Sequence, residues 1–198
     1  MFTTTPAKIT TEIRKFCNQI SSKSNPIYLE VKSLPTSIKN ECFKNVQNYI
    51  SQNGGTIQYG WRIWECAGIM VEAEFHSVWV SPEGEFVDIS PAEEKNILFL
   101  PDNSKIYEGK QINNIRLAFS NNPLVKEFIY LNNRFFEEMN KGELIDKFGA
   151  VAVPAHIITP LMQRKDEVGL KLFEIFAKPN SPCYCGSGRK FKKCCKNR

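Results

Sequence analysis

The chain has 198 residues, of which 42% are hydrophobic and 24% charged, and its formal net charge is +5. This composition is typical of a soluble globular protein, and the length suffices to bury a real core. No apolar run approaches the roughly 18 residues that a membrane-spanning helix needs, and the first residues lack the pattern of a secretory signal. We therefore expect a cytoplasmic protein without a membrane span.

The first fifty residues predict two helices separated by a short strand. Apolar residues at helical spacing indicate a helix over 10–21, and residues 27–31 are typical of a strand. A second helix is expected between Thr36 and Asn53, where two glycines follow. Either Thr36 or Asn40 can cap it, and with Asn40 as the cap Cys42 lies in the first turn.

The next segment predicts an antiparallel sheet. Strands are expected over 57–65, about 68–80 and 85–89, with a turn at 81–84 between the last two. Three tryptophans cluster around this hairpin, for which core packing is the preferred interpretation over the lining of a cleft: Trp61, Trp64 and Trp79. Further short strands over 97–100 and 115–119 complete the sheet.

Helices dominate the remainder of the body. An apolar stripe predicts a helix that starts near residue 121 and runs to about 140, and a last helix is expected over 161–177. The fold class is therefore α+β, an antiparallel sheet packed with helices. We divide the chain into a body of residues 1–177, helical from about 121 onward, and a C-terminal tail of residues 178–198.

The tail differs from the body in its cysteines and its charge. Four cysteines follow the pattern Cys183-x-Cys185-x8-Cys194-Cys195, and seven cationic residues without any acidic residue leave the body with a net charge of −2. Four thiolates in two close pairs can hold a tetrahedral Zn²⁺, whose binding would supply most of the folding energy of so short a segment. Iron is the weaker metal alternative, and a disordered basic tail with unligated thiols is the alternative without metal.

The tail also resembles a known motif. Residues 180–195, with the sequence NSPCYCGSGRKFKKCC, closely resemble the SEC-C motif, named for the zinc-binding C-terminal tail of the translocation ATPase SecA. The final ligand position, usually histidine in SecA, is Cys195 here. The resemblance implies zinc bound by Cys183, Cys185, Cys194 and Cys195, and docking to a partner protein or the ribosome. It covers about a tenth of the chain and implies nothing about the body.

The predicted hairpin brings a histidine and a carboxylate together. The sequence at 81–84 suits a three-residue loop with Gly84 in the left-handed conformation, which pairs Ser81 with Glu85 and His76 with Ser90. His76 and Asp88 then lie on one face of the sheet as diagonal neighbours, about 7–8 Å apart at the backbone. A loop one residue shorter or longer would place them on opposite faces.

Such a pair can activate a thiol. An imidazole oriented by a carboxylate takes the proton of a cysteine, and a helix N-terminus would favour the Cys42 thiolate. The order Cys42, His76, Asp88 resembles that of papain-like and transglutaminase-like cysteine enzymes, over about residues 38–91. This resemblance implies a thiol-dependent hydrolase or transferase acting on an amide or thioester, although no sharp signature surrounds Cys42 and no oxyanion donor is identified.

Several alternatives remain open at this stage. His76 can be a satisfied structural residue, or it can share a metal with Glu72, Glu74 and Asp88. His156 is interpreted as structural. The alternative function is a non-catalytic adaptor that docks through the basic zinc tail, and RNA can be bound only by that tail because the body is acidic.

Overall fold

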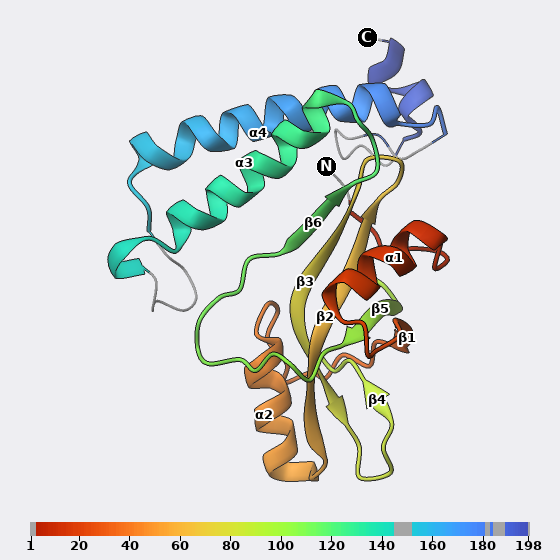
Figure 1. Cartoon of the computed structure of the whole chain (residues 1–198), viewed down its shortest axis with the longest axis vertical. Coiled ribbons are helices and arrows are strands. Elements are labelled where there is room, and N and C mark those ends of the chain that lie inside the picture. Colours follow the sequence, from red (N-terminus) through yellow and green to blue (C-terminus); the bar gives the residue numbers. More distant parts are fainter. Residues whose placement is uncertain (1–2, 145–151, 181–182, 184–188, 198) are drawn as a thin grey trace. The chain divides into compact units, whose positions relative to one another are not determined.

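The computed structural model describes residues 3–144, 152–180, 183 and 189–197. It confirms the α+β class: an antiparallel, nearly closed sheet is packed with four α-helices (Figure 1). The contacts divide the chain into two compact units. One comprises Thr5–Trp64 and Glu72–Ile115, and the other Met1–Thr4, Glu65–Val71 and Arg116–Arg198.

Six strands form one sheet in the order β1-β5-β2-β3-β4, with β6 paired to β3. The strands are β1 (Ile27–Glu30), β2 (Thr56–Cys66), β3 (Met70–Val80), β4 (Phe86–Val87), β5 (Asn96–Pro101) and β6 (Ile115–Ala118). Just after β1, Val31 forms a parallel bridge to Asp88, and the Lys32 amide donates a hydrogen bond of 2.8 Å to the Asp88 carbonyl oxygen. These contacts join the two ends of the strand order, so the sheet nearly closes on itself.

Two helices pack against the sheet in the unit formed by Thr5–Trp64 and Glu72–Ile115. Helix α1 (Thr11–Ile20) is capped by the Thr10 hydroxyl, which accepts a hydrogen bond from the Ile13 amide, and α2 (Cys42–Asn53) ends before Gly54. The residue Val46 of α2 is fully buried against Val87 and Ile89. The strands contribute a separate buried cluster composed of Leu29, Val78, Ile97 and Phe99. The start of α2 is therefore fixed next to the residues that follow β4.

The β3–β4 hairpin has the predicted loop. The Ser81 amide donates to the Glu85 carbonyl at 2.9 Å, the Gly84 amide donates to the Ser81 carbonyl at 2.9 Å, and Gly84 has a φ of 89°. Trp79 pairs with Val87, which is the expected register. The returning strand is shorter than predicted and ends at Val87, because the chain then turns to the residues around β1.

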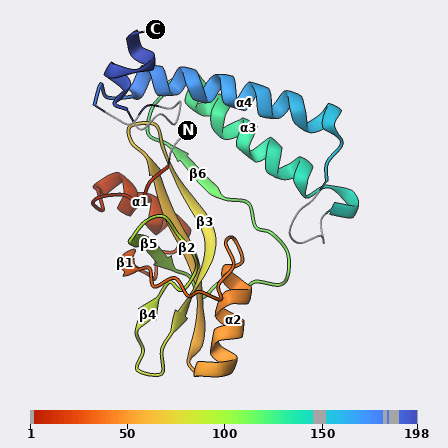
Figure 2. The ribbon, with the colours of Figure 1, turned by 180° about the vertical axis from the view of Figure 1, so that it is seen from behind.

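The second unit contains α3 (Pro123–Met139) and α4 (Ala155–Phe176), which lie side by side in both views of the ribbon (Figures 1 and 2). Their shared core consists of Cys66, Ile69, Met70, Val125, Phe128, Leu131, Val168 and Leu172. Helix α4 starts six residues earlier than predicted and includes Pro160. Pro160 is the sixth residue of α4, where it removes one intrahelical hydrogen bond, and packing of α4 on α3 outweighs that loss.

Short 3-10 helices at Gly142–Leu144, Phe191–Lys193 and Cys195–Asn197 complete the described elements. Within the described residues, no helix is both long and apolar enough to cross a bilayer.

A Cys-His-Asp cluster and a candidate metal centre

Cys42 is the first residue of α2. The N-cap is Glu41, whose carbonyl accepts a hydrogen bond of 2.9 Å from the Asn45 amide, and no side chain of the described residues caps the helix. Neither expected cap is used, since Asn40 instead turns the chain with a φ of 65°. Cys42 nevertheless lies in the first turn, so the positive end of the helix dipole is directed at its thiol.

An asparagine one turn into α2 braces the segment before Cys42. The Asn45 side chain accepts from the Ile38 amide at 2.9 Å and donates to the Ile38 carbonyl at 2.8 Å. It also lies 3.4 Å from the Ser90 hydroxyl. Sequence reasoning missed this brace, although Asn45 stands three residues after Cys42 on the buried side of the helix, where an unpaired amide would be costly.

His76 and Asp88 form the predicted pair. His76 Nε2 lies 3.0 Å from Asp88 Oδ2, and the two side chains are almost wholly buried, with residue exposures of 6% and 0%. The second carboxylate oxygen, Asp88 Oδ1, accepts a hydrogen bond of 2.9 Å from the Ser90 amide. Both carboxylate oxygens of Asp88 are thus hydrogen-bonded, which fixes the plane of the His76 ring. The other ring nitrogen, Nδ1, is left for a further contact.

Electrostatics connect Cys42 to this pair. Burial alone lowers the pKa of His76, but the charges of Asp88 and Cys42 and their hydrogen bonds to the ring outweigh it and raise that pKa well above 6.5. Burial acts to raise the pKa of Asp88, and the charge and hydrogen bond of His76 overcome it, so that this pKa falls below 3.8. Cys42, His76 and Asp88 therefore meet in one unit of the fold.

The other two cysteines of the body have a different environment. Burial raises the pKa of Cys17 to about 12 and the pKa of Cys66 to about 11. Neither thiol is ionised near neutral pH, which makes both of them internal references for the reactivity of Cys42.

The alternative metal site in the body lacks support from the contacts. The Glu74 carboxylate accepts a hydrogen bond of 2.7 Å from Trp64, and Glu72 binds the Asn114 side chain. His156 is exposed on α4, in the unit that does not contain His76. Among the described residues, the group of potential metal ligands is the one formed by cysteines in the tail.

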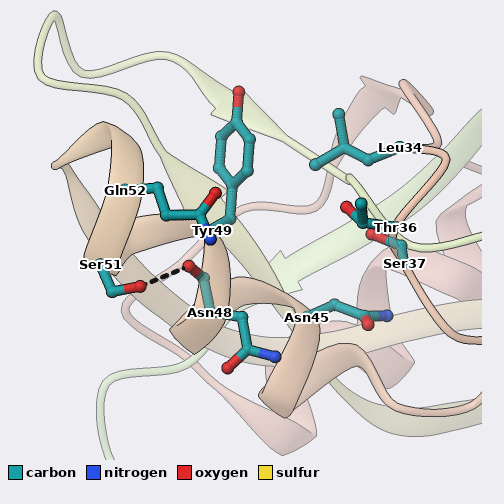
Figure 3. Close-up of a pocket in the computed structure, with 8 residues that line it drawn as sticks. All are labelled: Leu34, Thr36, Ser37, Asn45, Asn48, Tyr49, Ser51 and Gln52. Carbon is teal, nitrogen blue, oxygen red and sulfur yellow. Dashed lines mark hydrogen bonds between the residues drawn. The ribbon is translucent and has the colours of Figure 1, made fainter.

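A polar cavity of about 220 Å³ opens beside α2 (Figure 3). It is lined by Leu34, Thr36, Ser37, Asn45, Asn48, Tyr49, Ser51 and Gln52. Cys42, His76 and Asp88 are not part of this lining.

Three of the four predicted metal ligands gather in the tail. The Sγ atoms of Cys183, Cys194 and Cys195 all lie within 4.8 Å of one another, and Cys183 and Cys194 are buried. The fourth predicted ligand, Cys185, lies outside the described residues. No disulfide joins the six cysteines that the structure describes.

The backbone and one aromatic side chain hold this cluster together. The Cys183 amide donates to the Arg189 carbonyl at 2.8 Å, and the Cys194 amide donates to the Phe191 carbonyl at 3.0 Å. The buried ring of Phe191 packs edge-on against Phe173 of α4, with 5.2 Å between ring centroids. The tail therefore packs against the end of α4. No local pattern in the sequence predicted this contact.

The donor set fits a thiophilic metal. A tetrahedral ion with metal–sulfur bonds of about 2.3 Å places its sulfur ligands about 3.8 Å apart, which is compatible with the spacing of the three described cysteines. Exposed cations close in sequence to the cysteines offset the excess negative charge of the thiolates: Lys178, Arg189, Lys190, Lys192, Lys193 and Lys196. This composition favours a metal ion over three separate thiols.

Comparison with known proteins also points to a metal-binding segment in the tail. No curated protein and no solved structure matches the chain. The SEC-C motif matches residues 180–197, the segment that contains the clustered cysteines. The clustered cysteines lie beside the end of α4. This protein therefore carries a SEC-C motif that forms a candidate metal centre at residues 180–197.

Proposed function

We propose that the protein is a thiol-dependent hydrolase or transferase that acts on an amide or thioester. Cys42 is the nucleophile, His76 the general base and acid, and Asp88 the group that orients the imidazole. The single observation that carries the proposal is the buried hydrogen bond of 3.0 Å between His76 and Asp88, next to a cysteine at the first position of a helix.

The reaction follows from these positions. The Cys42 sulfur attacks the carbonyl carbon of the substrate while the thiol proton passes to His76, and the departing amine or thiol takes that proton as its bond to carbon breaks. Water or a second acceptor then releases the acyl group from the sulfur. No described side chain caps the start of α2. The Cys42 amide at this position is therefore suited to donate a hydrogen bond to the developing oxyanion.

Cysteine-specific alkylation tests this assignment. The intact protein is treated with iodoacetamide near neutral pH, and the rate at each cysteine is read by peptide mass spectrometry. We expect Cys42 to react at least about tenfold faster than Cys17 and Cys66, because burial keeps those two thiols protonated. His76→Ala should slow Cys42 alone, and a Cys42 rate that does not respond to this change would refute the proposal.

We infer that the metal of the SEC-C motif is zinc, held by Cys183, Cys194 and Cys195 together with Cys185. Sulfur ligands in this number are characteristic of structural zinc sites, whose role is to hold a short segment in one conformation. Stoichiometric zinc in protein purified without a chelator is the result that this assignment requires.

A second function, docking of the tail on an anionic surface of a protein or the ribosome, is favoured by its exposed cations. Because phosphate contacts release counterions, we expect purified ribosomes to sediment the protein at low salt and to lose it steeply as salt rises. Replacing Lys190, Lys192 and Lys193 by glutamine should abolish the association, while the same change at three exposed lysines of the helices (Lys15, Lys126 and Lys171) should not. Association that survives removal of the tail cations would contradict this function.

A further inference from the structure

Part of the segment between β5 and β6 carries one half-buried side chain among exposed ones. Over residues 103–111 every residue is exposed except Tyr107, which is half-buried. Hydrogen bonds from Gln58 to Asn103 and from Ser104 to Asp102 hold the start of this loop, and exposed segments of this kind open more readily than a packed core. The place where Tyr107 packs therefore decides what this loop covers.

Tyr107 packs on the residue that follows Cys42. Its ring is stacked on Phe43 with 3.9 Å between centroids and 4° between ring planes. Phe43 is supported from below by Phe75 at 5.4 Å and Tyr59 at 6.1 Å, so it offers a fixed aromatic surface. The stack holds Tyr107 at the first turn of α2.

The Tyr107 phenol interacts electrostatically with the residues at the start of α2. Burial and the neighbouring charges of Glu41 and Cys42 raise the pKa of Tyr107, so the phenol stays neutral beside them. Cys42 itself is only 8% exposed, although a nucleophile must meet its substrate. Access to Cys42 therefore requires that a neighbouring side chain move away, and Tyr107 is the neighbour carried by an exposed loop.

We propose that Tyr107 is a displaceable lid on Cys42, closed when its ring stacks on Phe43 and open when a substrate carbonyl approaches the sulfur. Opening would free the face of Phe43 beside the nucleophile. We expect a substrate that carries a flat, apolar group next to its reacting carbonyl, because such a group best replaces the Tyr107 ring on Phe43. This inference rests on the proposed role of Cys42 as the nucleophile.

Variants at position 107 test the lid. Tyr107→Ala removes the ring and should raise the rate of Cys42 alkylation roughly three- to tenfold, in line with the loss of one aromatic stack. Tyr107→Phe keeps the stack and should retain the wild-type rate. The matched control is Ile106→Ala, because Ile106 is 65% exposed on the same loop, and it should leave the rate unchanged. An unchanged rate in Tyr107→Ala would overturn the proposal.

A second measurement keeps the native sequence of the loop. An N-benzyl iodoacetamide adduct on Cys42 should displace Tyr107 and speed tryptic cleavage after Lys105 and Lys110. The control is Cys42→Ser treated in the same way. Its other cysteines react as in the wild-type protein, and only the adduct at position 42 is missing. Equal cleavage in the two proteins would overturn the lid. Dependence of the alkylation rate on His76 tests the proposed nucleophile separately, so the two ideas can fail independently.

Discussion

Asp88→Asn should bring the pKa of His76 from well above 6.5 to below it. Burial of the ring opposes its charged form, and the Asp88 carboxylate is the main group that offsets this penalty. Without that charge, burial prevails and the imidazole becomes neutral near neutral pH. An NMR titration of the His76 ring, assigned by comparison with His156→Gln, measures the change directly.

The same substitution should reduce the rate of Cys42 alkylation by roughly 10²-fold or more, the range that a well-oriented general base contributes. Asp102→Asn is the matched control, because Asp102 is also a buried carboxylate of the same unit but accepts its hydrogen bonds from Trp61 and Ser104. A His76 pKa that stays raised in Asp88→Asn would show that Asp88 does not govern the imidazole.

The pair also makes stability depend on pH in a defined window. The raised pKa of His76 contributes stability below about 6.5 that is lost as pH rises through the folded value, and the lowered pKa of Asp88 contributes stability above about 3.8 that is lost as pH falls through its folded value. The wild-type advantage over Asp88→Asn in the free energy of unfolding should therefore be largest between about pH 3.8 and 6.5, at about 2–3 kcal/mol.

Cys195→Ser should remove the metal and release the tail from α4. Binding of a structural zinc ion contributes on the order of 10 kcal/mol to the folding of such a segment, far more than one aromatic contact between Phe191 and Phe173 can replace. We expect loss of stoichiometric zinc in metal analysis and rapid tryptic cleavage after Arg189 and Lys190. The far-ultraviolet circular dichroism of the four helices should change little.

The conservative control is Cys195→His, which keeps four ligands because an imidazole also binds zinc. It should retain zinc and protection from trypsin. A zinc chelator should reproduce the serine phenotype in the wild-type protein, and added zinc should reverse it. Stoichiometric zinc and an intact tail in Cys195→Ser would refute the assignment of Cys195 as a ligand.

Local patterns in the sequence were sufficient to predict most of the elements. The helical stripe of α1, the alternation of β3 and the loop at Ser81–Gly84 each depend on neighbours within a few residues, and the structure agrees with them. The loop length also predicted that Asp88 would face His76, and the two side chains do meet, although the β3–β4 pairing ends at Val87 and does not extend to His76 and Ser90. Where local signals conflicted, as at Pro160, the predicted boundary was wrong because packing of α4 on α3 outweighs one lost hydrogen bond.

Taken alone, the sequence determined the residue types of both candidate sites, the parity that pairs His76 with Asp88 and the spacing of the tail cysteines. Tertiary structure alone decided that α2 brings Cys42 to that pair, that Asn45 braces its approach, and that Phe191 seats the tail on Phe173. The physical reason is that parity and spacing follow from short-range backbone geometry, whereas these three contacts depend on how separate elements bury their apolar faces against one another.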